Sequence, residues 1–307
     1  MRIRSTAWTP APRTDPDPDP VARARQIAAL LAGRRTAVLT GAGLSTPSGI
    51  PDYRSPGSPT RRPMTVDDFR ASAENRRRYW ARNHLGWRHM DAARPNAAHI
   101  ALRDLQDAGS VTGIITQNVD MLHLKAGSSP VIDLHGSYGR VACMSCGART
   151  SRHRLADRLE AANPGYADRV RSRGAIEVAP DADAALADIG DFRAVGCELC
   201  DGPLKPDIVY FGESVAPAVV ARARRLVADA DVLLVAGSSL TVMSGLRFVK
   251  QAAAAGRDVV IVNRGATRGD ESATLSVDHR CEVVLPLVAG LAHPRSRPPD
   301  QPFAASV

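Results

Sequence analysis

The sequence predicts an α/β fold: a doubly wound, Rossmann-like parallel sheet with an inserted small zinc-binding module and a helical segment. Three observations predict it. Short apolar, β-branched runs alternate with helical stretches along most of the chain, which is the order that builds a parallel sheet. The first run ends in Gly41-Ala42-Gly43, a turn that lets the backbone approach a phosphate. Two Cys-x-x-Cys pairs interrupt the alternation between residues 140 and 203.

The elements of the first half follow in order. Residues 21–33 predict a helix, because three apolar side chains fall on one face and a glycine can end it. Residues 36–40 predict a buried parallel strand, since they are apolar and partly β-branched. After a long proline-containing loop, residues 66–93 and 96–105 have helical character.

The remaining elements continue the alternation. Apolar runs predict further strands at 111–116, 131–134, 232–236, 259–262 and 283–285. Helices are expected at 217–229 and 244–255.

We expect five segments along the chain. The tails, 1–20 and 293–307, are rich in proline and polar residues and are expected to be disordered and flexible. Residues 21–139 and 204–292 are expected to form the Rossmann-like domain, with 55–95 as a helical segment of a small domain. Residues 140–203 are expected to form the zinc-binding module.

Size and composition are those of an ordinary globular protein. The chain has 307 residues, 44% of them hydrophobic and 23% charged, enough for one large domain or for a large and a small one. No run reaches the roughly 18 apolar residues of a membrane span, and no apolar signal core begins the chain. We therefore expect a cytoplasmic protein without membrane contact. We also expect a monomer.

The formal charge of +8 comes almost entirely from arginine. Arginines are spread along the chain with acidic residues between them, and the densest cluster, at 61–62 and 76–78, is too short for a nucleic-acid stripe. A zinc ribbon that binds nucleic acid is an alternative, but no aromatic residues suited to base stacking surround the cysteines. We expect no specific nucleic-acid partner.

Four cysteines have the spacing of metal-binding knuckles: Cys143, Cys146, Cys197 and Cys200. Two such pairs offer the four thiolates of a closed, structural zinc site. Two disulfides are the competing interpretation, which an oxidising compartment would favour. We predict one structural Zn²⁺. The fifth cysteine, Cys281, precedes an apolar run and is expected to be a small buried residue.

Polar or glycine residues follow five of the predicted strands. Because parallel sheets bind ligands at the carboxyl ends of their strands, these positions predict a binding edge. A glycine turn together with amide and carboxylate side chains suits a dinucleotide. A conventional NAD dehydrogenase would carry an acidic residue about 20 residues past the glycines, where this chain has only a proline- and arginine-rich loop.

At this point the sequence resembles the sirtuins, the NAD-dependent protein deacylases. The family's motifs occur in order over residues 25–290: GAGLSTPSGIPDYR (41–54), TQNVD (116–120), LHGS (134–137), the two cysteine pairs, KPDIVYFGE (205–213) and GSSL (237–240). The class II branch, which includes a mitochondrial mammalian sirtuin, is indicated by RRRYWARN (76–83), SGLRF (244–248) and GATRGDES (265–272).

The resemblance implies NAD as cofactor and acyl-lysine proteins as substrates. It implies that His135 is the catalytic base, with Asn118 as a second catalytic residue. It implies these cofactor-binding residues: Gly41, Ala42, Gly43, Ser45, Asp52, Tyr53, Arg54, Gln117, Asn118, Val119, Asp120, Gly237, Ser238, Ser239, Asn263, Arg264, Gly265 and Cys281. It implies that the substrate peptide adds a strand to Val209, Tyr210, Phe211, Gly212 and Glu213.

The implied reaction moves an acyl group from lysine to ADP-ribose and releases nicotinamide. A histidine suits the base because its pKa lies near neutrality. An ADP-ribosyltransferase, or a regulator that binds NAD or ADP-ribose without turnover, is the alternative.

The acyl group is left open by the sequence. Tyr79 and Arg82 have the spacing of the pair that holds acidic acyl groups in the desuccinylating branch, but their neighbours are those of class II, so we interpret the pair as coincidence. Longer acyl and lipoyl groups are implied alternatives to acetyl. Pro47 and Tyr53 depart from the residues most frequent in the family.

Overall fold

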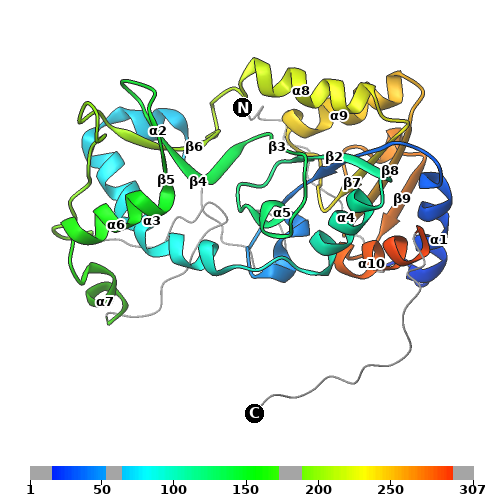
Figure 1. The fold of residues 1–307 in the computed structure, drawn as a ribbon, viewed down its shortest axis with the longest axis horizontal. Coiled ribbons are helices and arrows are strands. Elements are labelled where there is room, and N and C mark those ends of the chain that lie inside the picture. Colours follow the sequence, from blue (N-terminus) through cyan, green and yellow to red (C-terminus); the bar gives the residue numbers. More distant parts are fainter. Residues whose placement is uncertain (1–15, 53–63, 173–188, 293–307) are drawn as a thin grey trace, which may run out of the picture.

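The computed structural model describes residues 16–52, 64–172 and 189–292. A sheet of six parallel strands forms its larger part, in the order β3-β2-β1-β7-β8-β9 (Figure 1). Strand order reverses at β1, which pairs with β2 on one side and β7 on the other. The bounds are β1 (Thr36–Thr40), β2 (Val111–Thr116), β3 (Val131–Asp133), β7 (Val232–Ala236), β8 (Asp258–Asn263) and β9 (Leu275–Asp278).

Helices cover both faces of this sheet, so its central strands are buried throughout. On one face pack α1 (Pro20–Leu31), α4 (Ala97–Asp107) and α10 (Cys281–Ala292). On the other pack α8 (Pro217–Ala228) and α9 (Met243–Ala254). The doubly wound sheet that the sequence predicts is confirmed.

One predicted strand is wrong. Residues 283–285 lie inside α10, where Val284, Leu285 and Val288 are fully buried against α1 and α4. A short apolar run fits a buried strand and a buried helix equally well, and here the helical spacing decides. The last strand is instead β9, which the sequence analysis did not identify, because its four residues alternate polar and apolar side chains.

A smaller antiparallel sheet, in the order β5-β4-β6, forms the second part. Its strands are β4 (Gly136–Cys143), β5 (Arg149–Ser151) and β6 (Leu204–Ile208). The helices α2 (Val66–Ala71), α3 (Ala73–Ala92), α6 (Arg152–Ala162) and α7 (Tyr166–Arg171) contribute to one apolar core with this sheet. The predicted single helix over 66–93 is divided at Ser72, whose hydroxyl accepts a hydrogen bond from the Asn75 N–H at 3.0 Å and begins α3.

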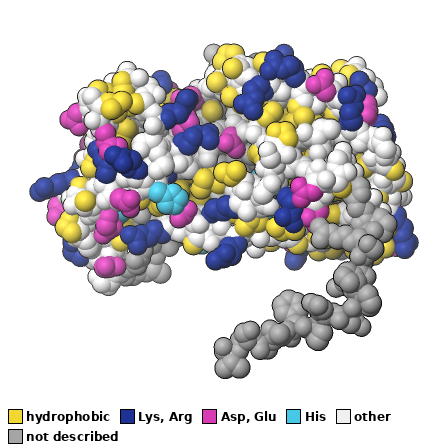
Figure 2. All heavy atoms as spheres, viewed as in Figure 1, with side chains coloured by type: hydrophobic (Ala, Val, Ile, Leu, Met, Phe, Trp, Pro, Cys, Tyr) yellow, Lys and Arg dark blue, Asp and Glu magenta, His cyan; other side chains and the backbone are white. Residues whose placement is uncertain are grey.

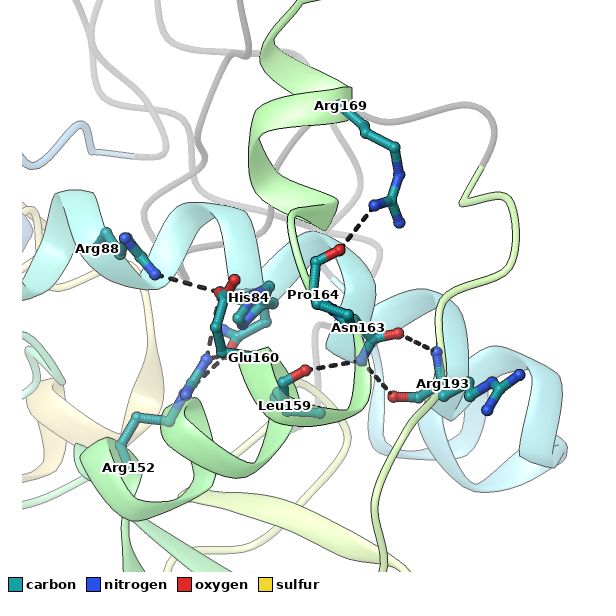
Figure 3. A network of polar contacts seen from close by, with 10 residues as sticks. His84, Arg88, Arg152, Leu159, Glu160, Asn163, Pro164, Arg169 and Arg193 are labelled. Carbon is teal, nitrogen blue, oxygen red and sulfur yellow. Dashed lines mark hydrogen bonds and ion pairs between the residues drawn. The ribbon is translucent and has the colours of Figure 1, made fainter.

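Polar contacts join α6 and its C-terminal end to α3 and to the segment that leads back toward the cysteines (Figure 3). Glu160 lies 3.2 Å from His84 Nε2 and 3.3 Å from an Arg88 guanidinium nitrogen. The Asn163 side chain donates to the Leu159 and Arg193 carbonyls, both at 2.8 Å. These contacts hold the long insertion between the two cysteine pairs against α3.

The surface is of mixed charge. Figure 2 shows lysine and arginine side chains dispersed among aspartate and glutamate on the face drawn. Among the helices of the described residues, none combines the length and apolar character needed to cross a bilayer.

Candidate active site

Glycines bring two loops into contact at the carboxyl edge of the large sheet. Gly41 and Gly43 follow β1, and Gly237 follows the neighbouring β7. The Gly43 N–H donates to the Gly237 carbonyl at 2.9 Å. A Cβ at Gly41 would lie 2.7 Å from the Ser238 Cβ, and a Cβ at Gly237 (φ +63°) would overlap the backbone of Leu44. Only glycines allow this approach.

The glycine edge offers open backbone donors. The N–H groups of Ala42, at the start of η1 (Ala42–Leu44), and of Ser238 have no partner among the described residues. Unpaired N–H groups at a helix start and a strand end form a phosphate site. The arrangement therefore fits the pyrophosphate of NAD.

Ser45, Asn118 and Asp120 form a hydrogen-bonded cluster beside the glycine edge. The Ser45 hydroxyl donates to Asp120 Oδ2 at 2.6 Å, and Asn118 Nδ2 donates to Ser45 Oγ and to the Gly41 carbonyl at 3.0 Å each. Burial raises the pKa of Asp120. The fold thus brings together three predicted site residues from two loops.

His135 lies between β3 and β4, where the two sheets meet. Its Nδ1 is 2.9 Å from the Gln117 carbonyl, an acceptor, so Nδ1 carries the proton of the neutral ring. Its Nε2 is 2.8 Å from Ser244 Oγ, which donates to it. Burial lowers the pKa of His135 to about 4, against the raising effect of the Gln117 carbonyl. This pKa is lower than the near-neutral value expected from the sequence, because the fold desolvates the ring. The ring is therefore neutral near pH 7, with a lone pair on Nε2.

Gln117 is held on two sides. Ser238 Oγ donates to its Oε1 at 2.7 Å. Gly245 of α9 packs against the same amide, since a Cβ there would lie 2.7 Å from Gln117 Nε2. Ser239, the next predicted residue, has its hydroxyl 3.0 Å from that of Thr241.

The predicted adenosine end lies after β8. Asn263 Nδ2 donates to the carbonyls of Arg264 and Gly265, at 2.8 and 3.1 Å. Asp278 of β9 accepts from the Arg264 side chain and the Gly265 N–H, both at 2.9 Å. Cys281 is buried, its thiol donates to a β8 carbonyl at 3.3 Å, and burial raises its pKa to about 12. The thiol has the expected packing role.

Of the other predicted cofactor residues, Tyr53 and Arg54 lie outside the described residues, and Asp52 is the last residue before that gap. Val119 packs against the core of the smaller part and accepts a hydrogen bond from the Tyr138 N–H at 3.0 Å.

Pro47 lies in η2 (Thr46–Ser48), at the start of that short helix, where a missing N–H costs little.

Backbone hydrogen bonds hold the predicted substrate segment, residues 209–213, in place. Val209 N–H donates to the His135 carbonyl at 2.8 Å, and Phe211 forms an isolated bridge with Thr65 at the start of α2. Both backbone groups of Tyr210 are bonded to Glu213. Within the described residues the Val209 carbonyl and the Gly212 N–H have no partner, so they remain for an added strand.

The four knuckle cysteines come together as predicted. Their four Sγ atoms all lie within 4.8 Å of one another. The shortest separations are 3.6 Å, from Cys143 to Cys200, and 3.7 Å, from Cys146 to Cys197. A closed set of four sulfurs fits structural zinc.

The Tyr79 side chain belongs to the core. It is fully buried, and its hydroxyl lies 3.0 Å from that of Tyr138. The side chain also packs edge-on against the rings of Phe69 and Trp80, both 5.3 Å away. That the Tyr79–Arg82 spacing is coincidental stays a prediction.

Two contributors to the site were missed by the sequence analysis. Ser244 binds His135, and Asn96 donates from Nδ2 to the Leu44 carbonyl at 2.8 Å and to Ser48 Oγ at 2.9 Å, which fixes the loop after β1. Asn96 carries a local signal as the N-cap of α4, whereas Ser244 shows nothing locally that points to His135.

Comparisons with known proteins agree with this geometry. A model of the Sir2 family matches residues 41–244. NAD-dependent protein deacetylase 1 of Mycobacterium avium is 61% identical, over 87% of this chain and 95% of that protein. NAD-dependent protein lipoamidase sirtuin-4 of Bos taurus is 43% identical, over 93% and 91% of the two chains.

Solved structures of the same family are also similar. A complex of Sir2 with a p53 peptide and NAD⁺ superposes with a TM-score of 0.67 and 30% identity, covering 87% of this chain and 96% of that one. Sir2Tm bound to a propionylated peptide gives a TM-score of 0.66 at 30% identity, over 85% and 94% of the chains. The sequence matches and the shared architecture together show that this chain belongs to the Sir2 family, the sirtuins.

Proposed function

We propose that this sirtuin is an NAD-dependent protein lysine deacylase, which transfers the acyl group of acyl-lysine to ADP-ribose and releases nicotinamide. The position of His135 carries the proposal: a neutral imidazole presents Nε2 at the junction of the two sheets, with Gln117, beside Asn118, holding its other nitrogen. The relatives named above as deacetylases support it.

Different residues of the site hold different parts of NAD. The glycine edge and Ser238 hold the pyrophosphate, and Asn263 to Gly265 hold the adenosine end. Gln117, Asn118 and Asp120 hold the nicotinamide ribose and carboxamide. Bound NAD would supply an electrophilic ribose carbon and nicotinamide as its leaving group.

His135 acts as the base. Its Nε2, which contacts the Ser244 hydroxyl in the structure, would accept the proton of a ribose hydroxyl once the cofactor is bound. Gln117 fixes the tautomer throughout, because its carbonyl keeps the proton on Nδ1. The acyl-lysine peptide enters beside Val209 to Glu213, where two backbone groups are open. Zinc, surrounded by four sulfurs, has a structural role only.

The test combines purified protein, NAD and peptides that carry acetyl, succinyl, long fatty acyl or lipoyl lysine. Lipoyl is included because a relative is named a lipoamidase. Mass spectrometry should find deacylated peptide and acyl-ADP-ribose from one acyl class. His135→Ala should lose turnover and keep NAD affinity, whereas His153→Ala, at an exposed position of α6, should keep both.

Equal, slow nicotinamide release by wild type and His135→Ala would refute the enzyme assignment. Labelled ADP-ribose on protein instead of deacylated peptide would favour ADP-ribosyl transfer. A monomer that acts in the cytoplasm remains our prediction for its state and place; light scattering at working concentration tests the first.

A further inference from the structure

A line of buried side chains connects the interior of the large sheet to Asn118. His123, in α5 (Leu122–Lys125), places Nε2 2.9 Å from Thr40 Oγ1. The Thr40 hydroxyl donates to Thr116 Oγ1 at 2.9 Å. Thr116 Oγ1 also accepts from the Asn118 backbone N–H at 3.1 Å. His123 and the two threonines are each at most 4% exposed.

The direction of the protons along this line follows from counting them. A hydroxyl has one proton, and Thr40 gives its proton to Thr116, so His123 Nε2 must be the donor to Thr40. The ring has one N–H to give, because burial lowers the pKa of His123 to about 3 and keeps the ring neutral. Nδ1 then carries a lone pair, which agrees with its lack of a hydrogen-bond partner among the described residues.

The end of the line is a residue of the proposed reaction. Asn118 is held through its side chain by Gly41 and Ser45, and through its backbone by Thr116. Two of its three holding contacts therefore come from the cofactor loop, and only the third comes from the rigid interior of the sheet. Small displacements of a reactive group lower the reaction rate strongly. Such groups therefore need support from packed elements.

We propose that His123 is a positioning residue: by donating from Nε2 it orders the Thr40 and Thr116 hydroxyls, which fix the backbone of Asn118 at the ribose. The inference rests on the proposed function, because that function places Asn118 at the nicotinamide ribose. His123 itself touches no substrate, since it is 2% exposed beneath the loop.

The test compares variants that break the line at two points. His123→Leu removes the donor, and Thr40→Val removes the hydroxyl at nearly constant volume. Each should lower kcat for nicotinamide release roughly tenfold, about the effect of one buried hydrogen bond, with KM for the peptide nearly unchanged. The double variant should be no slower than either single variant, because both remove the same line. His123→Gln, whose amide can donate to Thr40, should recover most of the rate.

Three results would overturn the inference. These are a double variant about a hundredfold slower than wild type, a Gln variant as slow as the Leu variant, or ¹⁵N NMR shifts that place the His123 proton on Nδ1.

His153→Leu, on α6, controls for loss of a histidine. If wild type releases no nicotinamide, the proposed function fails, and the NMR shifts together with NAD affinities of the same variants decide the inference separately.

Discussion

At the scale of single residues, three imidazoles stay neutral in the folded protein: His99 and His123 are buried, and His135 is partly buried. Burial lowers the pKa of His99 to about 4, of His123 to about 3 and of His135 to about 4, from 6.5. A neutral ring has one donor and one acceptor, so its partners fix which nitrogen is basic. For His135 the Gln117 carbonyl leaves Nε2 basic, and for His123 the Thr40 hydroxyl leaves Nε2 protonated.

These pKa values predict how stability depends on pH. Between pH 6.5 and about 4 the unfolded chain binds protons on His99, His123 and His135 that the folded chain does not. The free energy of unfolding should therefore fall as pH falls through this window, by up to about 1.4 kcal/mol per pH unit for each histidine. Asp120, whose pKa burial raises, opposes this at the acid end.

Urea unfolding at several pH values measures the dependence. His123→Leu should reduce the slope between pH 6.5 and 4, because it removes one of the four histidines whose pKa burial lowers: His84, His99, His123 and His135. An unchanged slope would show that His123 is protonated in the folded protein.

The glycine edge gives a second prediction, with a matched control. Gly237→Ala should raise KM for NAD more than about tenfold, because the Cβ would overlap the Leu44 backbone and displace the loop. Gly256 has a similar φ of +66° but nothing within 4 Å of its Cβ position. Gly256→Ala should cost about 1 kcal/mol of stability and leave KM for NAD unchanged. Similar values of KM for NAD in both variants would contradict the steric argument.

At the scale of elements, an ion pair holds the shape of the predicted substrate segment, residues 209–213. Lys205 Nζ of β6 lies 2.9 Å from a Glu213 carboxylate oxygen, and 4.9 Å from the centre of the Tyr210 ring. Glu213 also accepts from the Tyr210 N–H at 3.0 Å. The Lys205 side chain is 13% exposed, so the pair is shielded from solvent more than an ordinary surface pair.

Glu213→Gln should therefore raise KM for the acyl peptide several-fold while KM for NAD stays near wild type, because the charge-assisted contacts that fold the segment back are lost. Steady-state kinetics with each substrate varied in turn make the distinction. Glu198→Gln, in an exposed pair with Arg154, is the control and should change neither constant. A rise in KM for NAD alone would place Glu213 at the cofactor instead.

At the scale of the whole molecule, the zinc site stabilises the smaller part while the chemistry takes place at the larger sheet. Cys143 ends β4, the long strand that begins at Gly136, directly after His135. Metal binding contributes to the folding free energy of such a module. The cysteines therefore support one end of β4, and the other end of this strand directly follows His135, the proposed base.

Cys143→Ser should lose most of the metal, lower the melting temperature and lose turnover. Wild type should hold about one zinc ion per chain, measured by mass spectrometry of metals in protein purified without chelators. Cys281→Ser is the matched control: its thiol lies outside the four-sulfur cluster, so the variant should keep zinc. Full activity in metal-free Cys143→Ser would contradict a structural role.

The sequence by itself determined the sheet, the glycine turn and the two cysteine pairs, because each of these is encoded locally. Strands such as Thr36–Thr40 are continuous apolar runs, and two-residue spacing between cysteines fits one ion regardless of distant context. The polar residues after the strands also followed from the sequence, since parallel strands bring their carboxyl ends to one edge. Local pattern could not separate strand from helix over residues 283–285.

Only the tertiary structure decided which side chains touch. His135 and Ser244 are 109 residues apart, and His123 lies 83 residues from Thr40. No periodicity extends that far, because local pattern reflects only which face of an element is buried. The Gln117 carbonyl decides which nitrogen of His135 accepts a proton, and the position of α5 brings His123 Nε2 to Thr40. These contacts make His135 the proposed base and His123 the proposed support of Asn118.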